Sequence, residues 1–206
     1  LSKVVNFKDT VVQKATPPAK KAGAIDKTTV GADENASTLL EKAVRDYERE
    51  NYQAALDSLF HIVATESDHW AAYELLVDVL LQSGQDMDIP NQLQILENRS
   101  DLPARMLALV GLGYEASGNL EKAAAFVDQA LALDPECARA WNLKGVVAYR
   151  NGQGSEAAQW FQKASACDDH WGDPWTNMGT LHWEHGTRDK ALQCFEAGFR
   201  LSPTAP

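Results

Sequence analysis

Two short amphipathic helices joined by a turn recur along this chain every 34 residues, and few folds accommodate such a period. The clearest copy runs from residue 104 to residue 137 and reads ARMLALVGLGYEASGNLEKAAAFVDQALALDPEC. The string SGN predicts the turn, and the final DP ends the second helix because proline cannot continue it. The residues expected on the two facing surfaces are Leu107, Val110, Gly111 and Tyr114 in the first helix and Ala123, Val127, Ala130 and Leu133 in the second.

Two further copies follow in the same register. The first reads WNLKGVVAYRNGQGSEAAQWFQKASACDD and the second reads WTNMGTLHWEHGTRDKALQCFEAGFRLSP. They resemble the tetratricopeptide repeat, whose pattern is W-x2-L-G-x2-Y, then A-x3-F, then P. The first copy lacks the closing proline, and the second has His182 where the pattern prefers tyrosine. The matching positions are Trp141, Gly145, Ala157, Phe161 and Ala164, then Trp175, Gly179, Ala191, Phe195 and Pro203.

Two weaker copies precede these. The copy at residues 36–69 lacks the tryptophan and the glycine, and the second helix of the copy at 70–103 is interrupted by DMDIP. In that string Pro90 fits only the first turn of a helix. The resemblance implies an all-α fold, a right-handed α-solenoid of about five helix-turn-helix units. We expect this domain to span residues 36–206, with units at about 36–69, 70–103, 104–137, 138–171 and 172–205.

Residues 1–35 differ from the rest in composition, being rich in Pro, Gly, Ala, Thr and Lys without a helical stripe. They carry six lysines and four acidic residues, a charge of +2 beside −12 for the remainder. We expect a flexible, weakly basic N-terminal segment. Its apolar strings VVNF and TVV suggest an alternative, in which the segment occupies the groove of its own chain or of a neighbouring copy.

The resemblance implies a non-catalytic module that binds a peptide or protein segment on a concave face lined by first helices. Asn142 could hold a peptide backbone, and Arg105 and Arg139 could pair with a ligand carboxylate. The alternative for each arginine is a solvated surface residue or an ion pair within the array. Some members of the family grip a chaperone carboxylate with Lys and Asn, but the matching positions here are Leu40 and Val44. The expected partner-binding residues are Arg105, Leu112, Arg139, Asn142, Val146, Tyr149, Thr176, Thr180 and Trp183.

The string DHW occurs twice, beginning at Asp68 and at Asp169, and the copies are 101 residues apart. That is one residue fewer than three repeats, so the string is expected to mark junctions between units and not catalysis. We expect both aspartates to cap helices and both tryptophans to fill the space between neighbouring units.

Two other strings resemble reactive sites. His182 and His185 are three residues apart on an expected helix with Glu184 between them, but no third metal ligand is close in sequence. Cys167 precedes Asp168, Asp169 and His170 at a helix end, where a core thiol and a helix cap are expected, not a nucleophile with its base. We therefore expect no catalytic residues, no metal and no cofactor.

The composition limits the class of partner. The formal net charge is −10, which disfavours nucleic acid and anionic membranes. The cysteines Cys137, Cys167 and Cys194 are few and far apart, as expected for reduced thiols in a cytoplasmic protein.

The C-terminal end of the array leaves three explanations open: a chain cut from a longer protein, an end buried in a self-association, or a tail that wraps back over the end. Trp183, Phe195 and Phe199 belong to the last helix pair, and no polar capping helix follows them. The chain is then expected to be a recruitment domain cut from a larger enzyme, for example a glycosyltransferase. Alternatively it is a scaffold that self-associates, through this uncapped repeat or through the N-terminal segment.

Overall fold

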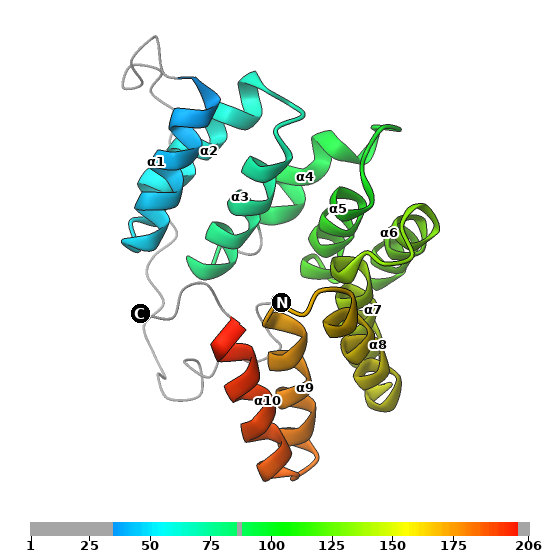
Figure 1. Cartoon of the computed structure of the whole chain (residues 1–206). Helices are drawn as coiled ribbons and strands as arrows, with labels where there is room; N and C mark the ends of the chain where they lie inside the picture. Colours follow the sequence, from blue (N-terminus) through cyan, green and yellow to red (C-terminus); the bar gives the residue numbers. More distant parts are fainter. Residues whose placement is uncertain (1–34, 86–87, 202–206) are drawn as a thin grey trace. The chain divides into compact units, whose positions relative to one another are not determined.

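The computed structural model describes residues 35–85 and 88–201, and every regular element in these residues is an α-helix (Figure 1). This confirms the expected all-α fold. The N-terminal segment and Pro203, on which several expectations rest, lie outside the described residues. The helices are α1 (Ala36–Glu48), α2 (Tyr52–Thr65), α3 (Trp70–Gln82), α4 (Ile89–Glu97), α5 (Ala104–Ala116), α6 (Leu120–Leu133), α7 (Ala138–Arg150), α8 (Gly154–Cys167), α9 (Asp173–Glu184) and α10 (Arg188–Leu201).

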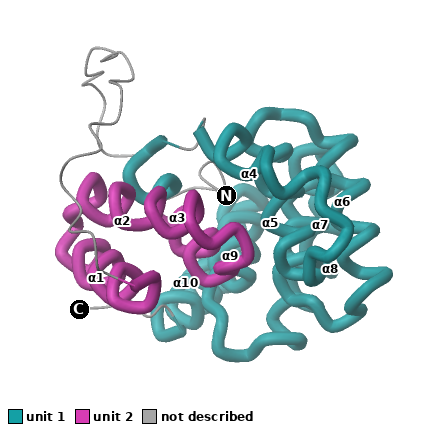
Figure 2. The backbone as a smooth tube through the Cα atoms, turned by 90° about the horizontal axis from the view of Figure 1, so that it is seen from above, with its two compact units in different colours: residues 1–4, 80–206 teal, residues 5–79 magenta. Residues whose placement is uncertain are grey.

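The chain divides into two compact units, drawn in different colours in Figure 2. Unit 2 comprises residues 5–79, and in its described part α1 packs against α2. Leu39 and Ala43 of α1 are buried there, as are Ala55 and Leu59 of α2. Unit 1 comprises residues 1–4 and 80–206 and therefore contains α4 to α10. The division falls within α3.

Within unit 1 the helices stack as successive antiparallel pairs. Each first helix packs on its partner, in the pairs α5–α6, α7–α8 and α9–α10. Each second helix also packs on the first helix that follows, and the first helices α5, α7 and α9 contact one another in turn. This pattern of nearest-neighbour contacts is that of an α-solenoid. The first helices consequently form one continuous layer of unit 1.

Small residues set how closely the two helices of a pair approach. A Cβ atom built on Gly145 would lie 2.5 Å from the ring of Phe161, and one on Gly179 would lie 2.7 Å from the ring of Phe195. Both glycines are 34 residues apart, as are their phenylalanines, so the same crossing is built twice. The expectation that these glycines serve helix packing is confirmed.

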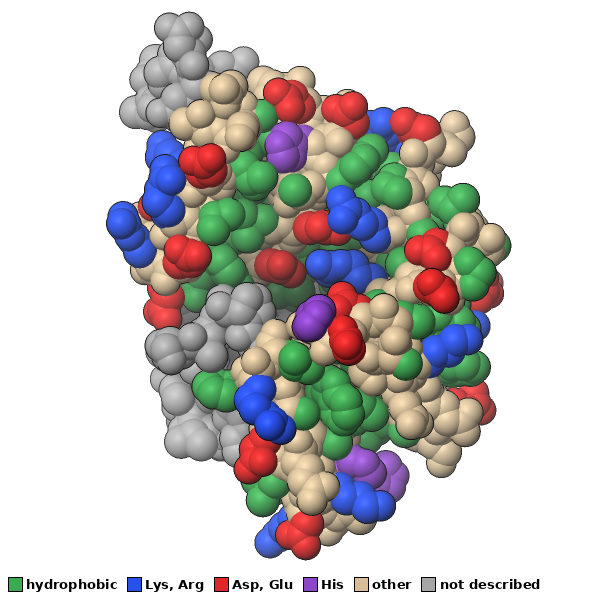
Figure 3. Space-filling view, in the orientation of Figure 1, with side chains coloured by type: hydrophobic (Ala, Val, Ile, Leu, Met, Phe, Trp, Pro, Cys, Tyr) green, Lys and Arg blue, Asp and Glu red, His purple; other side chains and the backbone are tan. Residues whose placement is uncertain are grey.

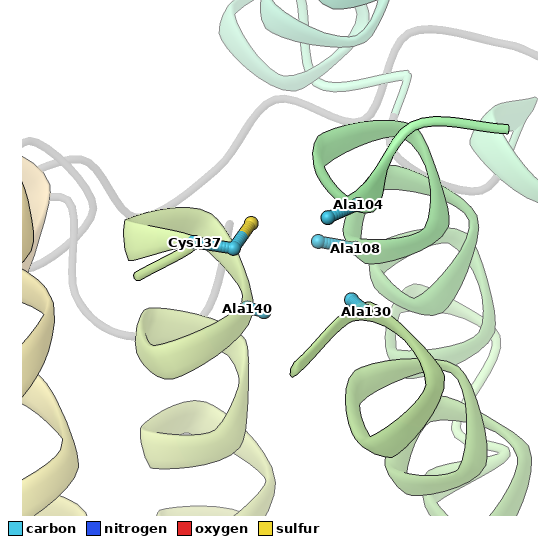
Figure 4. Close-up of a cluster of buried hydrophobic side chains, with 5 residues drawn as sticks. All are labelled: Ala104, Ala108, Ala130, Cys137 and Ala140. Carbon is cyan, nitrogen blue, oxygen red and sulfur yellow. The ribbon is translucent and has the colours of Figure 1, made fainter. Parts of the chain in front are cut away.

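The junction between neighbouring pairs is also built from small side chains. Where α5, α6 and α7 meet, Ala104, Ala108, Ala130, Cys137 and Ala140 form a buried cluster (Figure 4). Leu131 of α6 packs against this cluster. The expectation that Leu133 faces α5 is wrong, because this side chain is 61% exposed. Val127, Ala130 and Leu131 fill the buried side of α6, and Leu133 ends the helix toward solvent.

The turns inside the pairs repeat with the same period. Gly84, Gly118, Gly152 and Gly186 have positive φ and lie 34 residues apart. The same position in the α1–α2 turn is Glu50, which has a φ of 58°. In α4, Pro90 occupies the first turn as expected, and this helix is only 9 residues long.

No helix among the described residues combines the length and the apolar character that crossing a membrane requires. On the face of the molecule shown in Figure 3, acidic, basic and apolar side chains lie interspersed.

Candidate functional site

A cleft opens on the layer of first helices in unit 1, between α5 and α7. Its empty volume is about 320 Å³, which includes space open to solvent. The space open to the centre of a water-sized sphere is only about 30 Å³, far less than in a small-molecule pocket, so the cleft suits at most part of one side chain of a larger ligand. The cleft is lined by Ala108, Leu109, Leu112, Arg139, Asn142, Leu143, Val146 and Trp171.

The floor of the cleft is apolar. Ala108 and Leu112 lie one turn apart on α5, and Val146 comes from α7, which packs directly against α5. Leu112 is 8% exposed and Val146 is 1% exposed, so the floor is shaped by core residues. An aliphatic side chain entering the cleft would therefore be removed from water on the floor side.

The rim carries a cation and an aromatic ring. Arg139 comes from the first turn of α7, and its guanidinium carbon lies 5.4 Å from the centre of the Trp171 ring. Trp171 belongs to the segment that joins α8 to α9, and both side chains are half-buried. The arrangement is a cation–π contact at the mouth of an apolar cleft.

Asn142 lies at the polar edge of the cleft and is 2% exposed. Its Oδ1 accepts a hydrogen bond of 2.9 Å from Nδ2 of Asn177 on α9. This buried amide pair ties α7 to α9. The sequence predicted that the Asn142 amide would bind the backbone of a ligand. In the structure its oxygen already accepts a hydrogen bond from within the protein.

The structure brings four of the sequence-predicted residues together in this cleft, namely Leu112, Arg139, Asn142 and Val146. Of the remaining five, Thr180 is 1% exposed and donates to the carbonyl oxygen of Thr176. Trp183 is 44% exposed and lies 5.7 Å from the guanidinium carbon of Arg188. Those outside the cleft lining are Arg105, Tyr149, Thr176, Thr180 and Trp183.

Tyr149 links two first helices. Its hydroxyl donates a hydrogen bond of 2.6 Å to Oε1 of Glu184 on α9. Burial, together with this carboxylate, raises the pKa of Tyr149 to about 12. One repeat earlier Glu115 of α5 forms an ion pair of 3.1 Å with Arg150 of α7. The ends of α5 and α7 are therefore each joined to the following first helix by a polar contact.

Trp171 is the rim residue that the sequence did not assign to the site. The DHW string placed it at a junction, but the second copy stands one residue earlier in the repeat frame than the first. Trp70 is consequently the first residue of α3, whereas Trp171 precedes α9 by two residues and reaches the cleft. The spacing of 101 residues carries this signal.

The expectation that the two DHW aspartates cap helices is wrong. At α3 the side chain of His69, not Asp68, accepts a hydrogen bond of 3.3 Å from the backbone N–H of Ala72. At α9 the cap position is Gly172, and the side chain of Asp169 is 85% exposed. The helix begins later in the second copy because Pro174 favours its first turn.

The residues considered for metal or thiol chemistry have structural partners. Nδ1 of His182 lies 3.0 Å from the Thr187 hydroxyl, and Nδ1 of His185 lies 2.7 Å from the Leu181 carbonyl oxygen. Within residues 35–85 and 88–201 no three His, Cys, Asp or Glu side chains are grouped to hold a metal ion. Burial raises the pKa of the Cys167 thiol, which disfavours the thiolate.

Comparisons with known proteins agree with this architecture. Residues 103–173 match the family model described as tetratricopeptide repeat. No curated protein matches the chain.

Solved structures provide further matches. A thermophilic tetratricopeptide repeat protein of Thermus thermophilus is 19% identical, with a TM-score of 0.67 over 82% of this chain and 92% of that one. A chain in the Cut9–Hcn1 hetero-tetramer is 19% identical, with a TM-score of 0.64 over 81% of this chain and 32% of that one. PilF of Pseudomonas aeruginosa is 16% identical, with a TM-score of 0.55 over 81% and 76%. Residues 103–173, which include the helices that form the cleft, therefore resemble the tetratricopeptide repeat, and the solved structures share the fold.

Proposed function

We propose that the cleft between α5 and α7 binds a peptide segment of another protein, without catalysis. Tetratricopeptide repeat proteins are generally non-catalytic modules for protein–protein interaction, which supports this class of function. The observation that carries the proposal is the cleft itself, an apolar floor with Arg139 and Trp171 at its mouth.

The chemistry of the cleft indicates the kind of peptide. Leu112 and Val146 favour an aliphatic side chain as the anchor, because its burial removes apolar surface from water. The Arg139 guanidinium at the rim, whose charge already acts on the Asp173 carboxylate, also favours a ligand carboxylate close to that anchor, either an acidic side chain or a chain terminus. We therefore infer a ligand in which an aliphatic residue and a carboxylate are neighbours.

The test is a selection of binding sequences from a displayed random peptide library, followed by titration of synthetic copies with the purified chain. The expected sequences carry an aliphatic residue beside a carboxylate. Arg139→Ala and Trp171→Ala are each expected to weaken binding by about tenfold, the loss of one charge-assisted or aromatic contact.

The matched control is Lys163→Ala. Its ammonium also lies over an indole, 3.6 Å from the centre of the Trp141 ring, but neither residue lines the cleft. We expect this variant to bind the selected peptides as the wild type does. Failure to select any peptide, or binding that survives both rim substitutions, would contradict the proposal.

A further inference from the structure

The α9–α10 helix pair exposes apolar side chains. Leu192 and Phe199 of α10 are 55% and 63% exposed, and Trp183 of α9 is 44% exposed. Leu192 and Phe199 are seven residues apart and therefore lie on the same side of the helix. We call the surface formed by Trp183, Leu192 and Phe199 the end face.

Two positions equivalent to end-face residues join neighbouring pairs elsewhere in unit 1. Leu131 stands two repeats before Phe199, and it packs against the cluster that contains Ala140 of α7 and Cys137, the residue before that helix. Tyr149 stands one repeat before Trp183, and it bonds to Glu184 of α9. The end face is thus equivalent to the surface on which one helix pair packs against the first helix of the next pair. Its natural complement is a first helix.

A charge pair accompanies this interface at the α6–α7 junction. Nζ of Lys144 on α7 lies 3.4 Å from a carboxylate oxygen of Asp128 on α6. Two repeats after Asp128 stands Glu196 on α10, and three repeats before Lys144 stands Lys42 on α1. Both Glu196 and Lys42 are exposed. Glu196 on α10 therefore stands at the position of the acid, and Lys42 on α1 at the position of the base, in the Asp128–Lys144 ion pair.

This charge pair does not recur at every junction between neighbouring helix pairs. At the α8–α9 junction the equivalent positions are Gln162 and Met178, which carry no charge. Glu196 of α10 and Lys42 of α1 therefore carry opposite charges at positions that are uncharged at the α8–α9 junction. Thr38 of α1, at the position of Ala140, is exposed.

We propose that the end face of one copy docks on α1 of a second copy, head to tail, with Glu196 opposite Lys42 of that copy. The alternative of two end faces packing on each other is disfavoured by charge. An antiparallel α10 pair that places Leu192 against Phe199 brings the two copies of Glu196 together, and like charges repel. A head-to-tail contact uses two different surfaces and so generates chains or closed rings.

The first test measures the solution mass of the full chain by sedimentation over about a hundred-fold range of concentration. We expect the mean mass to rise with concentration above that of one chain. Phe199→Asp is expected to abolish the rise. Leu133→Asp is the matched control, since Leu133 is 61% exposed on α6, outside the end face, and it should leave the rise intact. Leu192→Asp replaces Phe199→Asp if circular dichroism shows that the latter is unfolded.

The second test reverses the charges. Glu196→Lys and Lys42→Glu should each shift assembly to higher concentration by severalfold, and the double variant should restore it. A mass that stays at one chain throughout would overturn the proposal, as would assembly that tolerates both Phe199→Asp and Leu192→Asp. If Phe199→Asp abolishes assembly but Lys42→Glu leaves it unchanged, the end face pairs with a surface other than α1, and the proposal is also overturned.

Discussion

Glu50 has a positive φ in the turn between α1 and α2. In every other described helix pair the equivalent residue is a glycine. The φ of Glu50 is 58°, and the four glycines at this position have φ between 71° and 80°. An L-residue in the left-handed region costs about 1–2 kcal/mol, because its Cβ crowds the following carbonyl oxygen. The α1–α2 turn therefore carries strain that the other turns avoid.

Replacing Glu50 with glycine is expected to stabilise unit 2. The relief of strain outweighs the greater freedom of glycine in the unfolded chain, which leaves a net gain of about 0.5–1 kcal/mol. The measurement is the free energy of unfolding from urea titration. Glu50→Ala is the control, because it removes the charge and keeps the Cβ; it should give no gain. A loss of stability in Glu50→Gly would contradict the argument.

At the scale of helices, contacts between residues 35 apart in sequence tie α5 to α7 and α7 to α9. Arg150 pairs with Glu115, Asn177 donates to Asn142, and Tyr149 donates to Glu184. The carboxylate of Glu115 is 3% exposed, so its pairing with Arg150 satisfies a group that would be costly to leave alone. These polar contacts fix the register of α5, α7 and α9, whereas the small side chains between pairs set their spacing.

Tyr149→Phe tests one of these ties through its pH dependence. Burial and Glu184 raise the Tyr149 pKa from 10.0 to about 12, so the folded state retains a proton that the unfolded state releases. The stabilisation is complete below pH 10 and is lost as the pH rises toward 12. Wild type should therefore lose stability more steeply than Tyr149→Phe across this window, while at pH 7 the variant is less stable by about 1 kcal/mol. Parallel pH profiles would contradict this role.

The helix pairs could be predicted from the sequence because their signals are local. Glycine turns, alanine crossings and the 34-residue period each act within one repeat. The register also identified Leu112, Arg139, Asn142 and Val146, which face the cleft from first helices. Trp171 could not be assigned, because its position depends on where α9 begins after the α8–α9 segment. The burial of Thr180 could not be predicted from the sequence either, because it depends on how the neighbouring helices pack around this residue.

At the scale of unit 1, stability is a sum of pairs and of the interfaces between neighbours. The pair α7–α8 contacts α5 and α6 on one side and α9 on the other, whereas α4 packs on α5 and α10 on α9. A local defect in α7 should therefore weaken its direct neighbours more than the outer helices. Gly145 offers a site for such a defect, because the Phe161 ring leaves no room for a side chain there.

Gly145→Ala is expected to lower the stability of α7 and α8 by about 2 kcal/mol through overpacking against Phe161. Amide hydrogen exchange in these helices should then be roughly thirty-fold faster, with a smaller increase in α5, α6 and α9 and the smallest in α4 and α10. Gly154→Ala is the matched control, since its Cβ would lie 3.4 Å from the His185 ring, an ordinary contact, and exchange should not accelerate. Equal acceleration in all seven helices would show that unit 1 opens as a single cooperative body, and the nearest-neighbour description would fail.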